Sequence, residues 1–132
     1  MDLRLEQKTV LVTGSHRGTG QIIAHRFLAE GATVLVHGLE AGQAEASVDE
    51  IGGGVPVTGD ITNESASAQL LDACATHSID VLINNYGTAD PGSWGSSDEA
   101  AWLLAYQKNV LSAQRMIQGL LPSMIDRSWV WS

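Results

Sequence analysis

Positively charged residues are scarce in this sequence. Its 132 residues include seven lysines and arginines against 15 aspartates and glutamates, which gives a formal net charge of −8. Proteins that bind nucleic acid or an anionic membrane surface draw their affinity from clustered Lys and Arg. Because the few basic residues here are scattered along the chain, the composition argues against both classes of partner.

Cysteine is nearly absent as well. Cys74 stands alone, so it cannot form an internal disulfide, and no spacing of Cys and His resembles a metal site. No apolar run approaches the roughly 18 residues of a membrane span, and the opening MDLRLEQK carries charges where a signal peptide is apolar. We therefore predict a cytoplasmic protein without a metal, in which Cys74 faces the core from a helix rather than acting as a reactive thiol.

The remaining composition is that of an ordinary globular protein. Apolar residues make up 44% of the chain and charged residues 17%, and a length of about 100–150 residues is typical of one domain. We predict a single domain over residues 1–132.

Short β-branched runs alternate with helical patterns along the chain. This order is typical of an α/β fold, in which helices cover both faces of a parallel sheet. Strands are predicted over residues 8–13, 32–38, 54–60 and 79–85, and helices over residues 19–30, over residues 41–50 and from an N-cap at Thr62 through Cys74. A Gly, Pro and Ser-rich loop over residues 88–97 leads into a long helix, predicted over residues 97–120 and ending before Pro122; the last residues can begin a further strand.

The segment TGSHRGTG, residues 13–20, lies between the first predicted strand and helix. Glycines at such a junction let the backbone approach a pyrophosphate, while the helix N-terminus offers unpaired N–H groups. The segment lacks the Gly-Lys-Ser/Thr ending of a nucleoside-triphosphate loop, which argues against a kinase or a GTPase. We interpret it as a dinucleotide site; a structural turn without a ligand is the alternative.

Four patches together resemble one family, the short-chain dehydrogenases/reductases, which use NAD or NADP. The patches are Thr13-Gly14-x-x-x-Gly18-x-Gly20, Asp60-Ile61, Asn84-Asn85-Tyr86-Gly87 and Asn109-Val110, and the resemblance extends from Lys8 to about Met124. It implies a Rossmann-like, three-layer fold with the strand order 3-2-1-4, of which this chain would be a partial domain.

The resemblance also implies roles for individual residues. Asn109 would be catalytic, holding a water of the proton relay at a helix irregularity; a solvent-facing position is the alternative. Asp60 can instead be a turn acid, and Asn84 can simply brace neighbouring loops. The expected cofactor-binding residues are Gly14, Ser15, His16, Arg17, Gly18, Thr19, Gly20, His37, Asp60, Ile61, Asn85, Tyr86 and Gly87.

The choice between NAD and NADP normally depends on the end of the second strand, where an acid contacts the ribose or an Arg pairs with the 2′-phosphate. Gly38 and Leu39 stand at these places. Arg17, with His16 and His37 as helpers, favours NADP. NAD remains the alternative, with Arg17 a solvated charge and Glu40 reaching the ribose hydroxyls.

The family's catalytic Ser and Tyr-x-x-x-Lys have no counterpart here. Tyr86 and Tyr106 are the only tyrosines, and neither is followed four residues later by Lys. The resemblance therefore implies the cofactor-binding portion of a truncated enzyme, whose parent transfers hydride between a nicotinamide and a small alcohol or ketone, while this chain alone is expected to be inactive. The alternative is a non-catalytic dinucleotide-binding or self-associating module; a flavodoxin-like domain lacks its expected pocket residues.

Incomplete coverage of the sheet predicts self-association. Without a following strand, the apolar fourth strand, residues 79–85, is left as an exposed edge, unless residues 128–132 replace that strand. The helix after residue 97, which carries Trp102, Leu103, Leu111 and Met116, also lacks packing partners. We predict a homo-oligomer formed through the edge or through this helix.

Overall fold

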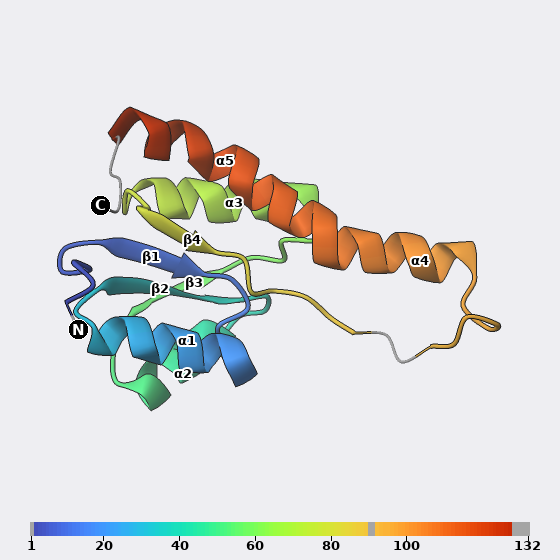
Figure 1. Cartoon of the computed structure of the whole chain (residues 1–132), viewed down its shortest axis with the longest axis horizontal. Coiled ribbons are helices and arrows are strands. Elements are labelled where there is room, and N and C mark those ends of the chain that lie inside the picture. Colours follow the sequence, from blue (N-terminus) through green and yellow to red (C-terminus); the bar gives the residue numbers. More distant parts are fainter. Residues whose placement is uncertain (1, 90–91, 128–132) are drawn as a thin grey trace.

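The fold is a four-stranded parallel sheet between two layers of helices. In the computed structural model, which describes residues 2–89 and 92–127, the strand order is β3-β2-β1-β4 (Figure 1). The strands are β1 (Thr9–Val12), β2 (Thr33–Gly38), β3 (Val55–Thr58) and β4 (Val81–Ile83). This is the Rossmann-like order expected from the sequence.

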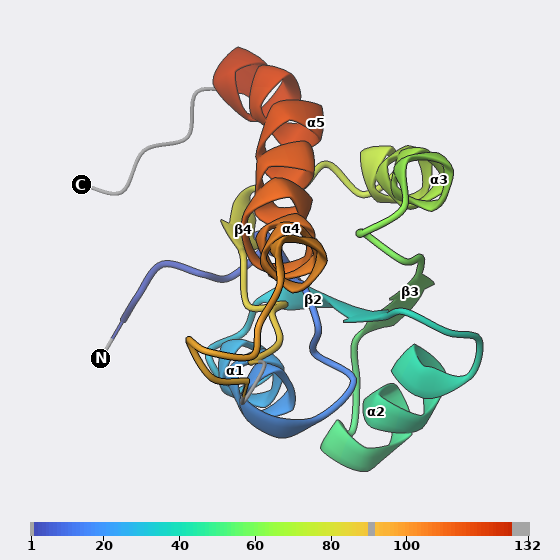
Figure 2. The same ribbon diagram turned by 90° about the vertical axis from the view of Figure 1, so that its right-hand side faces the viewer.

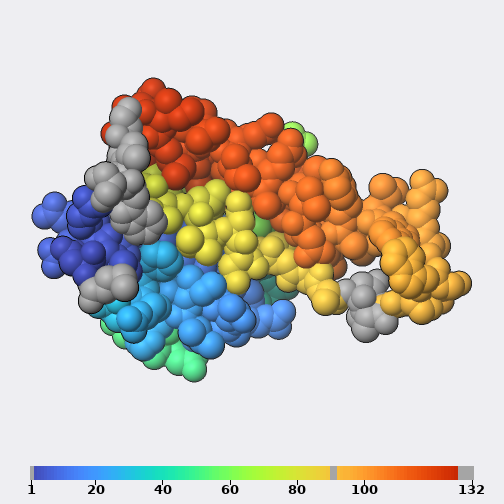
Figure 3. Space-filling view, viewed as in Figure 1, coloured from blue at the N-terminus to red at the C-terminus, as the bar shows by residue number. Residues whose placement is uncertain are grey.

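The helices divide between the two faces of the sheet. Figure 2 shows α1 (Gly18–Ala29) and α2 (Gln43–Ile51) on one side, and α3 (Glu64–Ala75) and α5 (Ser112–Arg127) on the other. A π-helical segment, η1 (Gln107–Leu111), joins α5 to α4 (Glu99–Tyr106). The α4 segment extends beyond the end of the sheet (Figures 1 and 3).

Successive side chains of each strand point to opposite faces of the sheet, so the strands contribute to two hydrophobic cores. Leu11 and Leu35 are fully buried with residues of α3 and α5, whereas Val10 and Val12 are fully buried with residues of α1 and α2. Cys74 lies in the first core, and its burial raises the pKa of the thiol to about 11. The thiol therefore stays protonated at neutral pH, as expected of a core cysteine.

Two predicted helix boundaries were wrong. The N-cap of α3 is Asn63, whose Oδ1 accepts the Ala66 N–H at 3.0 Å, while the Thr62 hydroxyl donates to Asp60. The last helix does not end before Pro122 but continues to Arg127. Proline removes one helical N–H, but Pro122 is exposed, so water can satisfy the carbonyl left unpaired, and core packing on both sides of Pro122 keeps the chain helical.

The outer side of β4 is a sheet edge in the described part of the chain. β4 pairs only with β1 there, and its three residues are all partly exposed. The replacement strand considered for residues 128–132 lies outside the described residues. The choice between an exposed edge and a replacement strand therefore stays a prediction.

An ion pair fastens the end of α5 to the start of β4. The Asp80 carboxylate accepts the Thr9 N–H at 2.9 Å and pairs with the Arg127 guanidinium at 2.6 Å; Arg127 also donates to the carbonyls of Ser78 and Ile79. We expect Asp80→Ala to lower the free energy of unfolding by about 1–3 kcal/mol, because it leaves partly buried donors unpaired.

Urea denaturation measures this loss. The control is Glu30→Ala, which removes the more exposed Arg26–Glu30 pair on α1 and should cost at most about 1 kcal/mol. Equal effects of the two substitutions would contradict the anchoring role of Asp80.

Candidate functional site

A cleft of about 550 Å³ opens at the carboxyl ends of β1 and β4. It brings together nine of the predicted cofactor-binding residues and four further residues, of which Leu39 and Glu40 were considered in the choice of cofactor and Gln43 and Thr88 were not placed in the site. The predicted residues are Gly14, His16, Arg17, Gly18, Thr19, Gly20, Asn85, Tyr86 and Gly87; the additional ones are Leu39, Glu40, Gln43 and Thr88.

The glycine-rich loop is packed so tightly that side chains are excluded from its inner positions. A Cβ atom on Gly20 would lie 2.4 Å from both the Gly14 carbonyl oxygen and the Asn85 Nδ2. Gly14 itself has a φ of +64°, and a Cβ there would lie 3.1 Å from the Cα of Tyr86. The loop backbone is therefore held directly against the end of β4.

Thr13 and Asn85 join the ends of β1 and β4. The Thr13 hydroxyl accepts the N–H groups of Asn85 at 3.1 Å and of Tyr86 at 3.0 Å, and the Asn85 Nδ2 donates to the carbonyls of Thr13 and Gly14. These bonds leave the Asn85 amide nitrogen committed to the backbone. Its described contacts make it a brace for the cleft.

His37 does not face the cleft, which corrects its prediction as a helper for the 2′-phosphate. The side chain is fully buried; Nδ1 accepts the Gly14 N–H at 2.9 Å and Nε2 lies 2.6 Å from the Gly59 carbonyl oxygen. Because Nδ1 is an acceptor, the ring proton is on Nε2, which donates to Gly59. His37 therefore positions the loop from below and has no atom left for a ligand.

The side chain of Ser15 is also turned inward. Its hydroxyl donates to the Val12 carbonyl at 2.6 Å and accepts the His37 N–H at 2.8 Å, and the residue is fully buried. Both bonds of the hydroxyl go to the backbone of β1 and β2, so the side chain does not line the cleft, and contact of the Ser15 backbone with a cofactor stays a prediction.

Asp60 and Ile61 do not line the cleft. Asp60 accepts the N–H and hydroxyl of Thr62 at 2.9 and 2.6 Å, which is the turn-acid arrangement considered as an alternative. The Ile61 side chain is 1% exposed and belongs to the core. Their contact with an adenine ring stays a prediction.

Asn109 lies in the π-helical segment η1, at the helix irregularity that the resemblance implied. Its Oδ1 accepts the Thr88 N–H at 2.8 Å, and its Nδ2 donates to the carbonyls of Thr88 and Ala105, both at 2.9 Å. The π-turn is stabilised by Ser112, whose N–H bonds to Gln107 and whose hydroxyl donates to Lys108. The Asn109 side chain thus fixes the loop after β4 to this helix.

A second cavity of about 370 Å³ adjoins the cleft. Thr88 lines both hollows, and Asn109 lines the second one together with Trp94 and Trp102, whose ring centroids are 5.3 Å apart. The polar groups of Thr88 and Asn109 therefore stand between the cleft and an aromatic-walled space.

Burial changes the titration of several groups at the site. It lowers the pKa of His37 and of His16, and the Arg17 charge acts in the same direction on His16. Burial and the nearby Asp60 charge raise the pKa of Tyr86. Both histidines therefore favour the neutral form and Tyr86 the protonated phenol.

The lowered pKa of His37 predicts loss of stability in mild acid. An unfolded histidine titrates near pH 6.5, so below about that pH the unfolded chain binds a proton that the folded chain does not. We expect the free energy of unfolding to fall by up to about 1.4 kcal/mol per pH unit for this group, until the folded pKa is reached. Urea denaturation at pH 7.5, 6.5 and 5.5 measures the slope, and rising stability on acidification would contradict the prediction.

Comparison with known proteins agrees with the fold and the loop. A model of the family described as short chain dehydrogenase matches residues 8–129. The chain belongs to this family. It is 32% identical over 132 residues to an uncharacterised oxidoreductase, YvrD, of Bacillus subtilis; the match covers 97% of this chain and 50% of that relative. It is 33% identical over 129 residues to the 7alpha-hydroxysteroid dehydrogenase of Escherichia coli; that match covers 93% of this chain and 50% of the relative.

Solved structures of short-chain dehydrogenases superpose closely on the chain. The 3-oxoacyl (acyl-carrier-protein) reductase of Agrobacterium tumefaciens, with NADP bound, gives a TM-score of 0.85 at 31% identity, covering 95% of this chain and 50% of that one. The L-sorbose reductase of Gluconobacter frateurii, complexed with NADPH and L-sorbose, gives 0.86 at 25% identity, with coverages of 96% and 51%. The chain thus spans about half the length of the relatives it matches.

The residues of the cleft fit the nicotinamide dinucleotide that this family uses. The glycine-rich loop leaves room for a pyrophosphate to approach its backbone closely. The Arg17 side chain is exposed beside the loop, and the His16 Nδ1 is buried without a hydrogen-bond partner among the described residues. In the same part of the chain no cluster of His, Cys, Asp and Glu could hold a metal. Nor is any of its helices long and apolar enough to cross a membrane.

Proposed function

We propose that this chain is the dinucleotide-binding portion of a short-chain dehydrogenase/reductase whose complete form transfers hydride between a nicotinamide cofactor and a small alcohol or ketone. The observation that carries the proposal is the tight packing of the glycine-rich loop. A Cβ on Gly20 would collide with the backbone of Gly14 and the side chain of Asn85. A loop that excludes side chains at the carboxyl end of a parallel sheet suits close backbone contact with a pyrophosphate.

Different residues of the cleft would bind different groups of the cofactor. Backbone N–H groups of the loop and the start of α1 would hold the pyrophosphate, and Arg17 would pair with a 2′-phosphate. The cofactor, when bound, supplies the hydride chemistry. Asn109 would hold a relay water at the edge of the site, while its side-chain amide fixes Thr88.

We propose NADP as the preferred cofactor. The exposed guanidinium of Arg17 supports this choice, as do the two structural relatives whose titles name NADP and NADPH. NAD is the second candidate, because the Glu40 carboxylate also lines the cleft and can accept hydrogen bonds from ribose hydroxyls.

We further propose that the chain alone binds dinucleotide without turnover, because no tyrosine of the sequence is followed by Lys in the Tyr-x-x-x-Lys pattern of the family. Titration of the purified chain with NADPH and NADH, followed by calorimetry, tests binding. An assay with both cofactors and a panel of ketones tests catalysis. Absence of binding would contradict the proposed site, and turnover by the purified chain would contradict the proposed inactivity.

We also propose that the chain is cytoplasmic and associates with copies of itself. Trp102, Leu103, Tyr106 and Val110 of α4 and η1 are 44–60% exposed, and β4 offers an unpaired edge among the described strands. Exposed apolar area of this kind favours association. Sedimentation velocity at several concentrations measures it, and a monomer throughout would contradict the proposal.

A further inference from the structure

The end of β2 is closed to the acidic residue that selects NAD in many Rossmann folds. That acid accepts hydrogen bonds from the adenosine ribose, and Gly38 stands in its place. A Cβ on Gly38 would lie 2.8 Å from the Cβ of Gln43 and 3.0 Å from the Ala44 nitrogen. Any side chain at position 38 would therefore displace the start of α2.

Gln43 occupies this space in a fixed orientation. Its Oε1 accepts the N–H groups of Leu39 at 2.9 Å and of Glu40 at 3.0 Å. Two backbone donors on one atom determine which end of the amide is oxygen, so the other end is the Nε2 donor. Nε2 has no hydrogen-bond acceptor among the described residues, and Gln43 lines the cleft.

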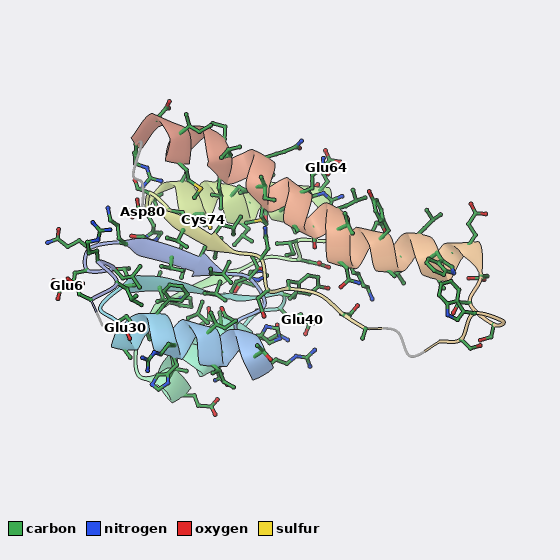
Figure 4. The ribbon with its side chains drawn as sticks, in the orientation of Figure 1. Glu6, Glu30, Glu40, Glu64, Cys74 and Asp80 are labelled. Atoms are coloured by element: carbon green, nitrogen blue, oxygen red, sulfur yellow. The ribbon has the colours of Figure 1, made fainter. Side chains whose placement is uncertain are left out.

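The charges near Gln43 are of both signs. Arg17 and Glu40 line the cleft with it. Figure 4 places Glu40 at the carboxyl end of the sheet, whereas Glu6, Glu30 and Asp80 lie at the opposite end. Glu40 is therefore the acid of the cleft lining that opposes a bound phosphate, and Gln43 and Arg17 supply donors.

We infer that Gln43 is a specificity-determining residue, whose Nε2 donates a hydrogen bond to the 2′-phosphate of NADP while its Oε1 keeps the turn after β2 closed. This inference rests on the proposed dinucleotide site. It assigns the discrimination to a side chain from the first turn of α2 because the end of β2 is sterically closed.

Gln43→Glu separates the two functions of the side chain. A carboxylate retains an oxygen to accept the N–H groups of Leu39 and Glu40, but replaces the Nε2 donor by a negatively charged acceptor. We expect NADPH affinity to fall at least about tenfold, with NADH affinity unchanged or increased. Gln69→Glu, on the exposed side of α3, adds the same charge outside the cleft and should leave both affinities unchanged.

Calorimetric titration of the full chain with NADPH and NADH measures the ratio of the two affinities, and thermal denaturation shows whether each variant folds. A tenfold shift of the ratio in Gln43→Glu, without one in Gln69→Glu, supports the inference. Equal losses for both cofactors, or no loss, would overturn it while leaving the dinucleotide site in place. A wild-type chain that binds neither cofactor would overturn the proposed function as well.

Discussion

Gly20→Ala is expected to lower the affinity of the chain for NADPH at least a hundredfold. The new methyl carbon would lie 2.4 Å from the Gly14 oxygen and from the Asn85 Nδ2, and 2.9 Å from the Gly14 carbonyl carbon. Two of these three atoms belong to the backbone, so no side-chain rotation relieves the contact. The loop must move away from β4, and the N–H groups that would hold the pyrophosphate move with it.

Calorimetric titration measures the loss, and two further measurements separate binding from folding. Overpacking of this kind costs about 1–3 kcal/mol of stability, which urea denaturation of the variant quantifies. Gly95→Ala is the matched control, because a Cβ there meets nothing within 4 Å, and it should bind as the wild type does. Binding by Gly20→Ala within threefold of the wild type would contradict the role given to the loop.

The order of strands and helices could be predicted from the sequence because local residue patterns determine it. Runs such as residues 8–13 are apolar on both faces, so they indicate strands of a covered parallel sheet, and Gly31 marks the end of the first helix with a φ of +90°. The end of the last helix could not be predicted in this way. Its continuation through Pro122 depends on the contacts of Met116, Leu120 and Met124 with the core, which are tertiary.

Residues of the site could be predicted only where their spacing along the sequence identifies them. The glycine loop and Asn85 were found from their order along the chain, whereas Gln43 was missed because its place in the cleft depends on how the turn after β2 closes. His37 was misplaced although a signal was available. Alternation puts residues 35 and 37 on the same face of the strand, and Leu35 is in the core.

His37→Leu is expected to lower the free energy of unfolding by about 2–5 kcal/mol. Leucine fills a similar volume, but it leaves the Gly14 N–H without its acceptor and the Gly59 carbonyl without its donor, at a fully buried position. Urea denaturation at pH 7.5 measures the loss. His25→Leu, on the exposed side of α1, removes a histidine without these bonds and should change stability by less than about 0.5 kcal/mol.

A shorter polar residue distinguishes the hydrogen bonds from simple packing. Asn at position 37 offers an acceptor and a donor and does not titrate, so His37→Asn should recover part of the stability lost in His37→Leu. It should also remove this group's share of the acid-dependent loss. If His37→Leu loses no more stability than His25→Leu, then the two bonds of His37 do not stabilise the loop. A slope with pH in His37→Asn equal to that of the wild type would show that the acid-dependent loss does not come from His37.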